Sequence, residues 1–184
     1  MKLSKRGEYA LRALINLGIA QDLGRGPVPA SALAEADNLP LKFAEQILMT
    51  LRENGYLESQ RGKFGGYAVK PAMKDIRIGE IVRLIDGPLA PIGCASQSAY
   101  TPCTCPDEAH CGLRMLMIDV RNAIANILDR YTLADVVEVT LRKLRRDGAE
   151  HYFMKEADND PVQELRNPAD PAEGFLSELL NENR

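Results

Sequence analysis

The chain has 184 residues, of which 45% are hydrophobic and 27% charged, and its formal net charge is −3. This composition is typical of a globular protein with a core and argues against a fibrous or low-complexity chain. No apolar run reaches the ~20 residues that a membrane-spanning helix needs, so we expect a cytoplasmic protein with no membrane partner.

The first 20 residues are basic and then apolar, a pattern shared by signal peptides and amphipathic helices. Glu8, Arg12 and Asn16 interrupt the apolar stretch, and its leucines and alanines recur at helical spacing. Periodicity of this kind favours an amphipathic helix of the mature protein over a secretion signal.

Residues 30–70 carry the pattern of a helix-turn-helix followed by a hairpin. The stretch 30–38 predicts a short helix, and a turn leads to a second helix that Asn54-Gly55 ends. Strand-like stretches at 56–59 and 67–70 flank a glycine-rich turn. The order predicts a mainly α fold with a small β-hairpin wing, which is a winged helix-turn-helix.

The C-terminal half begins with a short predicted helix at 76–85, and a strongly amphipathic helix is predicted at 113–130. Thr132 and Asp135 then resemble a capping box that opens another helix. The charge is uneven: residues 1–88 hold 13 Lys and Arg against 10 Asp and Glu, whereas residues 89–184 hold 10 against 16. The mildly basic first half is compatible with binding to nucleic acid.

A recognition helix places its N-terminal residues against base edges in the major groove. Gln can pair with adenine, Glu can accept from cytosine N4, Phe can touch a thymine methyl, and Lys favours phosphate. The alternative is a solvated helix face, or core packing for the phenylalanine. The candidate DNA-binding residues of this helix are Pro40, Lys42, Phe43, Glu45 and Gln46.

On the hairpin, Arg61 and Lys63 are placed to enter the minor groove, where basic side chains are attracted by the negative potential. The alternative for both is a solvated turn.

All four cysteines lie between Cys94 and Cys111. Clustered thiols are typical of a metal site, a disulfide or redox chemistry, and a reducing compartment disfavours structural disulfides. A structural zinc site favours C-x2–4-C pairs, which this loop lacks. A metal-free thiol switch with Cys103 as resolving thiol stays open. The chain has no phosphate-cradling P-loop, no nucleophile motif and only two histidines, so an enzyme is not expected.

Three stretches, "MKLSKRGEYALRAL", "LPLKFAEQILMTLRENGYLESQRGKFGGY" and "TLADV", resemble the Rrf-two superfamily of bacterial regulators. The resemblance covers roughly residues 1–145. It implies a homodimeric winged helix-turn-helix regulator, expected to be a repressor, that binds a double-stranded DNA operator and pairs through helix 113–130. One departure is Phe64, where the family usually has glycine.

The domains expected are a winged helix-turn-helix DNA-binding domain at 1–88, a cysteine loop and dimerisation helix at 89–146, and an acidic, flexible tail at 147–184.

The resemblance also implies a cofactor. In cluster-binding members of this superfamily, three cysteines hold an iron–sulfur cluster, 2Fe–2S or 4Fe–4S, whose state sets the affinity for DNA. Thiolates are the usual ligands of such clusters. Carried over to this chain, the ligands are Cys94, Cys105 and Cys111, and Cys103 is an extra thiol. The gap between Cys94 and Cys105 is longer than the family spacing.

A fourth ligand is implied by the resemblance as well. IscR-like members have a histidine three residues after the last cysteine, where this chain has Arg114. NsrR-like members use a carboxylate from the first helix of the partner subunit, and Glu8 stands at that position. The alternative for Glu8 is an exposed helix residue paired with Lys5 or Arg12. The expected metal ligands therefore include Glu8 beside the three cysteines.

Overall fold

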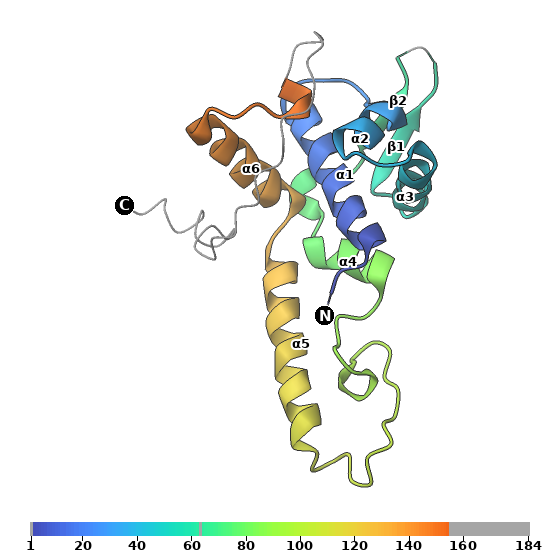
Figure 1. Ribbon diagram of the computed structural model, residues 1–184, viewed down its shortest axis with the longest axis vertical. Coiled ribbons are helices and arrows are strands. Elements are labelled where there is room, and N and C mark those ends of the chain that lie inside the picture. Colours follow the sequence, from blue (N-terminus) through green and yellow to red (C-terminus); the bar gives the residue numbers. More distant parts are fainter. Residues whose placement is uncertain (1, 63, 155–184) are drawn as a thin grey trace.

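The computed structural model describes residues 2–62 and 64–154 and is drawn in Figure 1. These residues contain six α-helices and one antiparallel pair of strands, which confirms the predicted mainly α fold with a hairpin wing. Short 3-10 turns lie at Met73–Asp75, Gly93–Ala95 and Tyr152–Met154. In chain order the elements are α1 (Lys5–Asp22), α2 (Ala30–Ala36), α3 (Leu41–Glu53), β1 (Leu57–Gln60), β2 (Gly66–Val69), α4 (Ile78–Asp86), α5 (Gly112–Arg130) and α6 (Leu133–Asp147).

Helix α1 forms the centre of the core and packs against α3, α4, α6 and β2. Its Leu14 and Leu17 are almost fully buried, and burying one such side chain is worth about 1.5–3 kcal/mol relative to leaving it exposed. Helix α6 lies close to α1 at Gly18, where an added Cβ would lie 2.7 Å from Cγ2 of Val137. Glycine at this position therefore lets the two helices lie in direct contact.

The wing is a short antiparallel hairpin whose register runs from Leu57 opposite Val69 to Gln60 opposite Gly66. Val28, in the loop after α1, exchanges two backbone hydrogen bonds with Tyr67, at 2.9 and 2.8 Å. This bridge fastens the hairpin to the loop that precedes α2, and thus ties the wing to the helix-turn-helix.

Helix α5 and the loop that precedes it extend away from the rest of the molecule (Figure 1). The C-terminal part of α5 packs on α4 through Ile124 and Leu128, which contact Ile78 and Val82. Close to this contact, Arg83 donates to both carboxylate oxygens of the α5 residue Asp129, at 2.6 and 2.7 Å. No residue of α5 is fully buried within the described part of the chain.

The predicted capping box is confirmed, because the Thr132 side chain accepts from the backbone of Asp135 and the Asp135 carboxylate accepts from the backbone of Thr132. Of the predicted tail at 147–184, the structure describes only 147–154. Within that segment Phe153 is buried at 3% exposure, and the Tyr152 hydroxyl donates to Glu35 at 3.0 Å. These contacts fasten Tyr152 and Phe153 to the helices. The acidic, flexible tail at 147–184 stays a prediction, and its residues 155–184 lie outside the described residues.

None of the helices in the described ranges combines the length and the apolarity needed to cross a lipid bilayer.

Candidate nucleic-acid interface and thiol site

Helix α3 presents one mainly polar face to solvent, which also exposes Leu41 and Met49. Its inward residues, among them Ala44, Ile47 and Leu48, are buried against α1 and α2, so the helix can expose only the opposite side. On that side Pro40 caps the helix N-terminus, and the candidates Pro40, Lys42, Glu45 and Gln46 are all exposed. The structure therefore leaves these side chains accessible, and their contacts with phosphates and bases stay a prediction.

Phe43 lies at the edge of this face. It is half-buried, and its ring packs edge-to-face on Tyr9 of α1, with 5.9 Å between the ring centroids. Core packing therefore accounts for much of this side chain, and its contact with a base stays a prediction.

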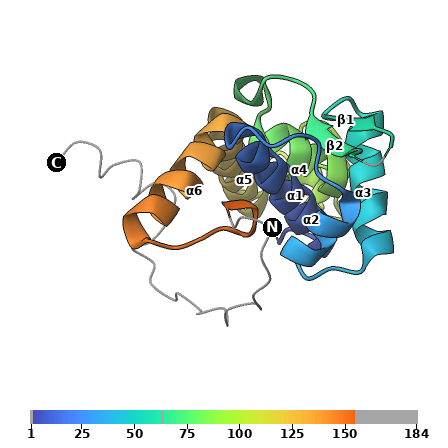
Figure 2. The ribbon, with the colours of Figure 1, turned by 90° about the horizontal axis from the view of Figure 1, so that it is seen from above.

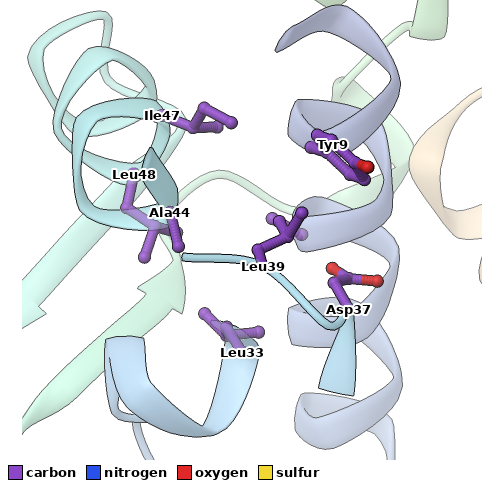
Figure 3. Close-up of a pocket in the computed structure, with 8 residues that line it drawn as sticks. Tyr9, Leu33, Asp37, Leu39, Ala44, Ile47 and Leu48 are labelled. Atoms are coloured by element: carbon purple, nitrogen blue, oxygen red, sulfur yellow. The ribbon is translucent and has the colours of Figure 1, made fainter. Parts of the chain in front are cut away.

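Polar contacts also fix α1 to its neighbours. Arg6 donates to the hydroxyl of Thr50 on α3 at 2.8 Å, and Arg12 pairs at 2.9 Å with the buried Asp37, the residue that follows α2. Burial raises the pKa of Asp37, and Arg12 opposes that rise. The space where α1, α2 and α3 meet holds a cavity of only about 10 Å³ (Figure 3), which is room for one water at most. Side chains therefore fill the junction of the three helices, and it has no room for a ligand.

The wing presents Arg61 to solvent beside α3, because β1 packs on that helix. Lys63 lies outside the described residues. Phe64, at the tip, is 84% exposed.

The loop between α4 and α5 brings the four free thiols into one neighbourhood. Cys94 is buried, Cys103 and Cys111 are half-buried, and Cys105 is exposed. Burial and then the adjacent Cys103 raise the pKa of Cys94. Hydrogen bonding to Cys103, followed by further contacts that include Cys111, raises the pKa of Cys105 to about 11. Cys103, which has no predicted ligand role, is thus a neighbour of both Cys94 and Cys105.

A polar frame holds the thiol loop. Glu108 accepts from the Tyr100 hydroxyl at 2.9 Å and pairs with Arg114 of α5 at 3.1 Å. Its carboxylate also lies 3.8 Å from the Cys103 sulfur.

Two arginines of α5 hold the backbone of the loop. Arg114 donates to the carbonyl of Cys94 at 3.0 Å, and Arg121 donates to the carbonyl of Ala95 at 2.6 Å. Arginine at position 114, where a histidine ligand would stand, therefore serves to anchor the loop to α5.

Glu8 is half-buried in the first turn of α1 and makes its contacts on its own helix. It pairs with Lys5 at 2.9 Å and with Arg12 at 3.7 Å, and the hydrogen bond from Lys5 lowers the pKa of Glu8. Within residues 2–62 and 64–154, no three His, Cys, Asp or Glu side chains are grouped closely enough to hold a metal ion. The predicted ligand set is therefore not assembled within this one chain and stays a prediction.

Sequence reasoning missed the frame residues Tyr100, Glu108 and Arg121, and it missed Asp86. The Asp86 carboxylate, at the end of α4, accepts from the backbone N–H of Ser4 at 2.8 Å and also from the Ser4 hydroxyl. Ser4 is the N-cap of α1, where an accepting side chain is favourable. Charged and polar residues in loops carry no periodic signal, so only the structure pairs them.

Comparisons with known proteins agree with this architecture. Residues 3–139 match the Rrf2 family, described as "Iron-dependent Transcriptional regulator". An rrf2-like HTH-type transcriptional regulator of Rhodobacter capsulatus is 39% identical over 140 residues, which cover 73% of this chain and 91% of the relative.

Two solved structures are also similar. CymR (YrzC), the global cysteine regulator of B. subtilis, has a TM-score of 0.63 and 30% identity, covering 75% of this chain and 97% of CymR. T. potens IscR has a TM-score of 0.58 and 28% identity, covering 75% of this chain and 87% of IscR. These matches confirm the predicted regulator in place of an enzyme. The chain belongs to the Rrf2 family of transcriptional regulators.

Proposed function

We propose that this regulator binds operator DNA as a homodimer, as a repressor, and that an iron–sulfur cluster at the thiol loop sets its affinity for DNA. The observation that carries the proposal is the gathering of all four thiols in the loop that joins the DNA-binding part to α5. The family description as iron-dependent and the likeness to IscR support it.

The donor set fits such a cluster. Burial raises the pKa of Cys94, and hydrogen bonding to Cys103 raises the pKa of Cys105; in both cases repulsion between adjacent thiolates adds to the rise. Positive iron would remove that repulsion and stabilise the thiolates. We propose Cys94, Cys105 and Cys111 as the residues that hold the cluster, with Glu8 of the partner subunit as the fourth ligand. When bound, the group would supply a redox-sensitive and labile centre.

A contact route leads from the loop to the DNA-binding helix. Asp86 ends α4 immediately before the loop and holds Ser4 at the start of α1. An added Cβ at Gly7 would lie 2.6 Å from the Asp86 carboxylate, so the two segments are in close contact. Helix α1 in turn holds α3 through the Arg6–Thr50 hydrogen bond. A coupling of ~1–3 kcal/mol along this route would change DNA affinity about 5–150-fold.

Pairing through α5 is supported by its exposed apolar face. Leu113 is 59% exposed, Leu116 55% and Ile127 49%, and their spacing places them on one side of the helix. A second copy of this chain would cover that side by a twofold axis. The two α3 helices of such a dimer would contact two half-sites about one helical turn apart, or a multiple of it.

A metal-free thiol switch is the second candidate, favoured by the hydrogen-bonded neighbours Cys94 and Cys103. One thiolate would attack a peroxide oxygen, releasing water and forming a sulfenic acid. The second thiolate would displace that oxygen as water and leave a disulfide. Two thiols thus give two electrons and two protons to one peroxide. The likeness to CymR, a cysteine regulator by its title, supports this candidate.

Purification without oxygen distinguishes an iron–sulfur cluster, a structural zinc site and a metal-free thiol switch. The cluster account expects a coloured protein with iron and acid-labile sulfide in about equal amounts. A colourless protein with one zinc per chain would point to the structural zinc site, and a metal-free protein would favour the thiol switch.

Cys103→Ser provides the sharpest variant, with Cys94→Ser as its matched control. In the cluster account only Cys94→Ser loses the iron. In the switch account both variants lose the peroxide-induced disulfide, which mass spectrometry under non-reducing conditions detects.

A further inference from the structure

A cavity of about 220 Å³ lies between α5, the end of α4 and the first part of the thiol loop. Residues 88–90 and 96–98 line it from the loop, and Arg121, Asn122 and Ala125 line it from α5. The loop runs beside α5 in Figure 1, and α4 lies beside α5 in the view from above in Figure 2. Because a cavity of ~150 Å³ can hold benzene, this one has room for a small organic molecule.

The lining of the cavity is positively charged. Arg83 and Arg121 both contribute to it, and none of the described residues that line it is acidic. Arg83 donates to the Asp129 carboxylate at 2.6 and 2.7 Å, which balances its charge. The hydrogen bonds of Arg121 go to uncharged groups, the Ala95 carbonyl at 2.6 Å and the Asn122 amide oxygen at 2.7 Å. The positive charge of Arg121 therefore favours an anion in the cavity.

Two hydrogen-bond donors are available to that anion. A guanidinium has more N–H groups than the bonds of Arg121 use. Ser96 also lines the cavity and is only 9% exposed. Its hydroxyl accepts from the backbone N–H of Ala99 at 3.0 Å and still has its own proton to donate. A guanidinium beside a hydroxyl suits a carboxylate, because charge-assisted hydrogen bonds are the strong ones.

The rest of the wall is apolar. Leu89 and Ala125 line the cavity, and both belong to the small apolar cluster that joins α4 to α5. Inorganic phosphate would use the donors but leave this wall in contact with water. An aliphatic acid would use the donors and also cover the wall, which is favourable. The lining therefore favours an organic anion over an inorganic one.

The cavity lies on a different side of α5 from the apolar face that we assign to pairing. Arg121 donates to the loop at Ala95, so this side of the helix faces the loop, and Ala125, one turn further, lies on the same side. Ile127 is two residues beyond Ala125, and residues two apart do not share a side of a helix. Pairing through Leu116 and Ile127 therefore does not require the partner to fill the cavity.

We propose that this cavity binds a small aliphatic carboxylate. The carboxylate accepts from Arg121 and from the Ser96 hydroxyl, and the aliphatic chain packs on Leu89 and Ala125. The bound anion joins the thiol loop to α5 and so holds the loop in place. The inference goes beyond the proposed function, because this binding is expected whatever the thiols hold and whether or not the chain binds DNA.

Its test is isothermal titration calorimetry of the full-length chain, purified without oxygen, with straight-chain carboxylates from acetate to octanoate. We expect the affinity to rise about 4-fold for each added CH₂ until the chain fills the cavity. Hexanoate should bind more tightly than 1-hexanol, which lacks the charge, and than inorganic phosphate, which lacks the chain. Bound hexanoate should also slow hydrogen exchange of the backbone amides at 95–99.

Two variants make the result specific to the cavity. Asn122→Asp keeps an oxygen that accepts from Arg121 and adds a negative charge to the lining, so hexanoate should bind about 10-fold more weakly. Asn126→Asp is the matched control, because Asn126 is exposed on α5 outside the lining, and it should bind as the wild type does. Ala125→Leu fills part of the cavity and should remove the gain in affinity with chain length.

Wild-type affinity for hexanoate in both Asn122→Asp and Ala125→Leu would overturn the site. Equal affinities for hexanoate and 1-hexanol would overturn its preference for an anion. Unchanged exchange at 95–99 in the presence of saturating hexanoate would show that the anion binds elsewhere.

Discussion

The DNA-binding head consists of residues 2–62 and 64–86 together with α6 and Tyr152–Met154, which share its core. The head and the arm, residues 87–130, are held by different kinds of interaction. The head encloses a continuous core, in which Leu14, Ile47 and Leu51 are each at most 1% exposed. The arm consists of the thiol loop and α5, and α5 has no fully buried residue among those described. Its loop is fastened mainly by polar bonds around Glu108 and Arg121. The head is packed within one chain, whereas we propose that the arm gains further contacts from a second subunit and from a bound cluster.

The largest expected effects come from the thiols of the arm. Cys94→Ala, Cys105→Ala and Cys111→Ala should each abolish bound iron, because three thiolates are needed to hold the cluster. Cys103→Ala should retain it. Iron and acid-labile sulfide per chain, measured on protein purified without oxygen, check this. Iron retained in Cys105→Ala and lost in Cys103→Ala would exchange the roles of these two thiols.

Glu8→Ala belongs to the same series and should leave a cluster that is more labile or shifted in its visible spectrum. Glu108→Ala is the matched carboxylate control, since Glu108 lies beside Cys103 in the loop of the same chain. If only Glu108→Ala changes the lability or the visible spectrum of the cluster, the carboxylate ligand lies in the loop, and Glu8 is an ordinary helix residue.

The next effect is on pairing. Leu116→Asp places a charge on the exposed apolar face of α5, and twofold symmetry brings two such charges together at the interface. We expect each subunit to lose roughly 2 kcal/mol of association free energy. Because the interface holds two copies of the substitution, the dissociation constant of the dimer should rise about 1,000-fold. Sedimentation equilibrium measures it. Asn126→Asp is the control, because Asn126 is exposed on another side of α5. A Leu116→Asp protein that remains dimeric would place the interface elsewhere.

A smaller effect is expected at the junction of head and arm. Asp86→Asn weakens the cap on α1, since an amide is a poorer acceptor than a carboxylate for the Ser4 hydrogen bonds. The ~5–150-fold response of DNA affinity to the loop site should shrink, with iron content unchanged. The exposed Asp75 provides the control Asp75→Asn. An undiminished response in Asp86→Asn would show that coupling follows another route.

The smallest effect concerns the head alone. Lys42→Ala and Arg61→Ala should each reduce the slope of log affinity against log salt by about one, for one lost phosphate contact. Fluorescence anisotropy across a salt series measures the slope. Unchanged slopes in both variants would remove these residues from the interface with DNA.

The sequence predicted those elements whose signal is local. Helices α3 and α5 follow from apolar periodicity, and Thr132 with Asp135 follows from capping chemistry. Contacts between distant segments were not predictable in this way. Asp86 and Ser4 are 82 residues apart, and no spacing rule joins them. The burial of Phe153 was not predictable either. It lies in an acidic segment and packs near α1 as a single apolar residue, without the periodic apolar neighbours that indicate a buried face.

We propose, above all, that the state of the arm sets the affinity of the head for DNA. The most direct test compares cluster-loaded and chelator-stripped protein on one selected duplex, at one salt concentration, with dimerisation checked in both. The account predicts affinities that differ about 5–150-fold. Equal affinities would contradict it, and would mean that the thiol site only stabilises the fold.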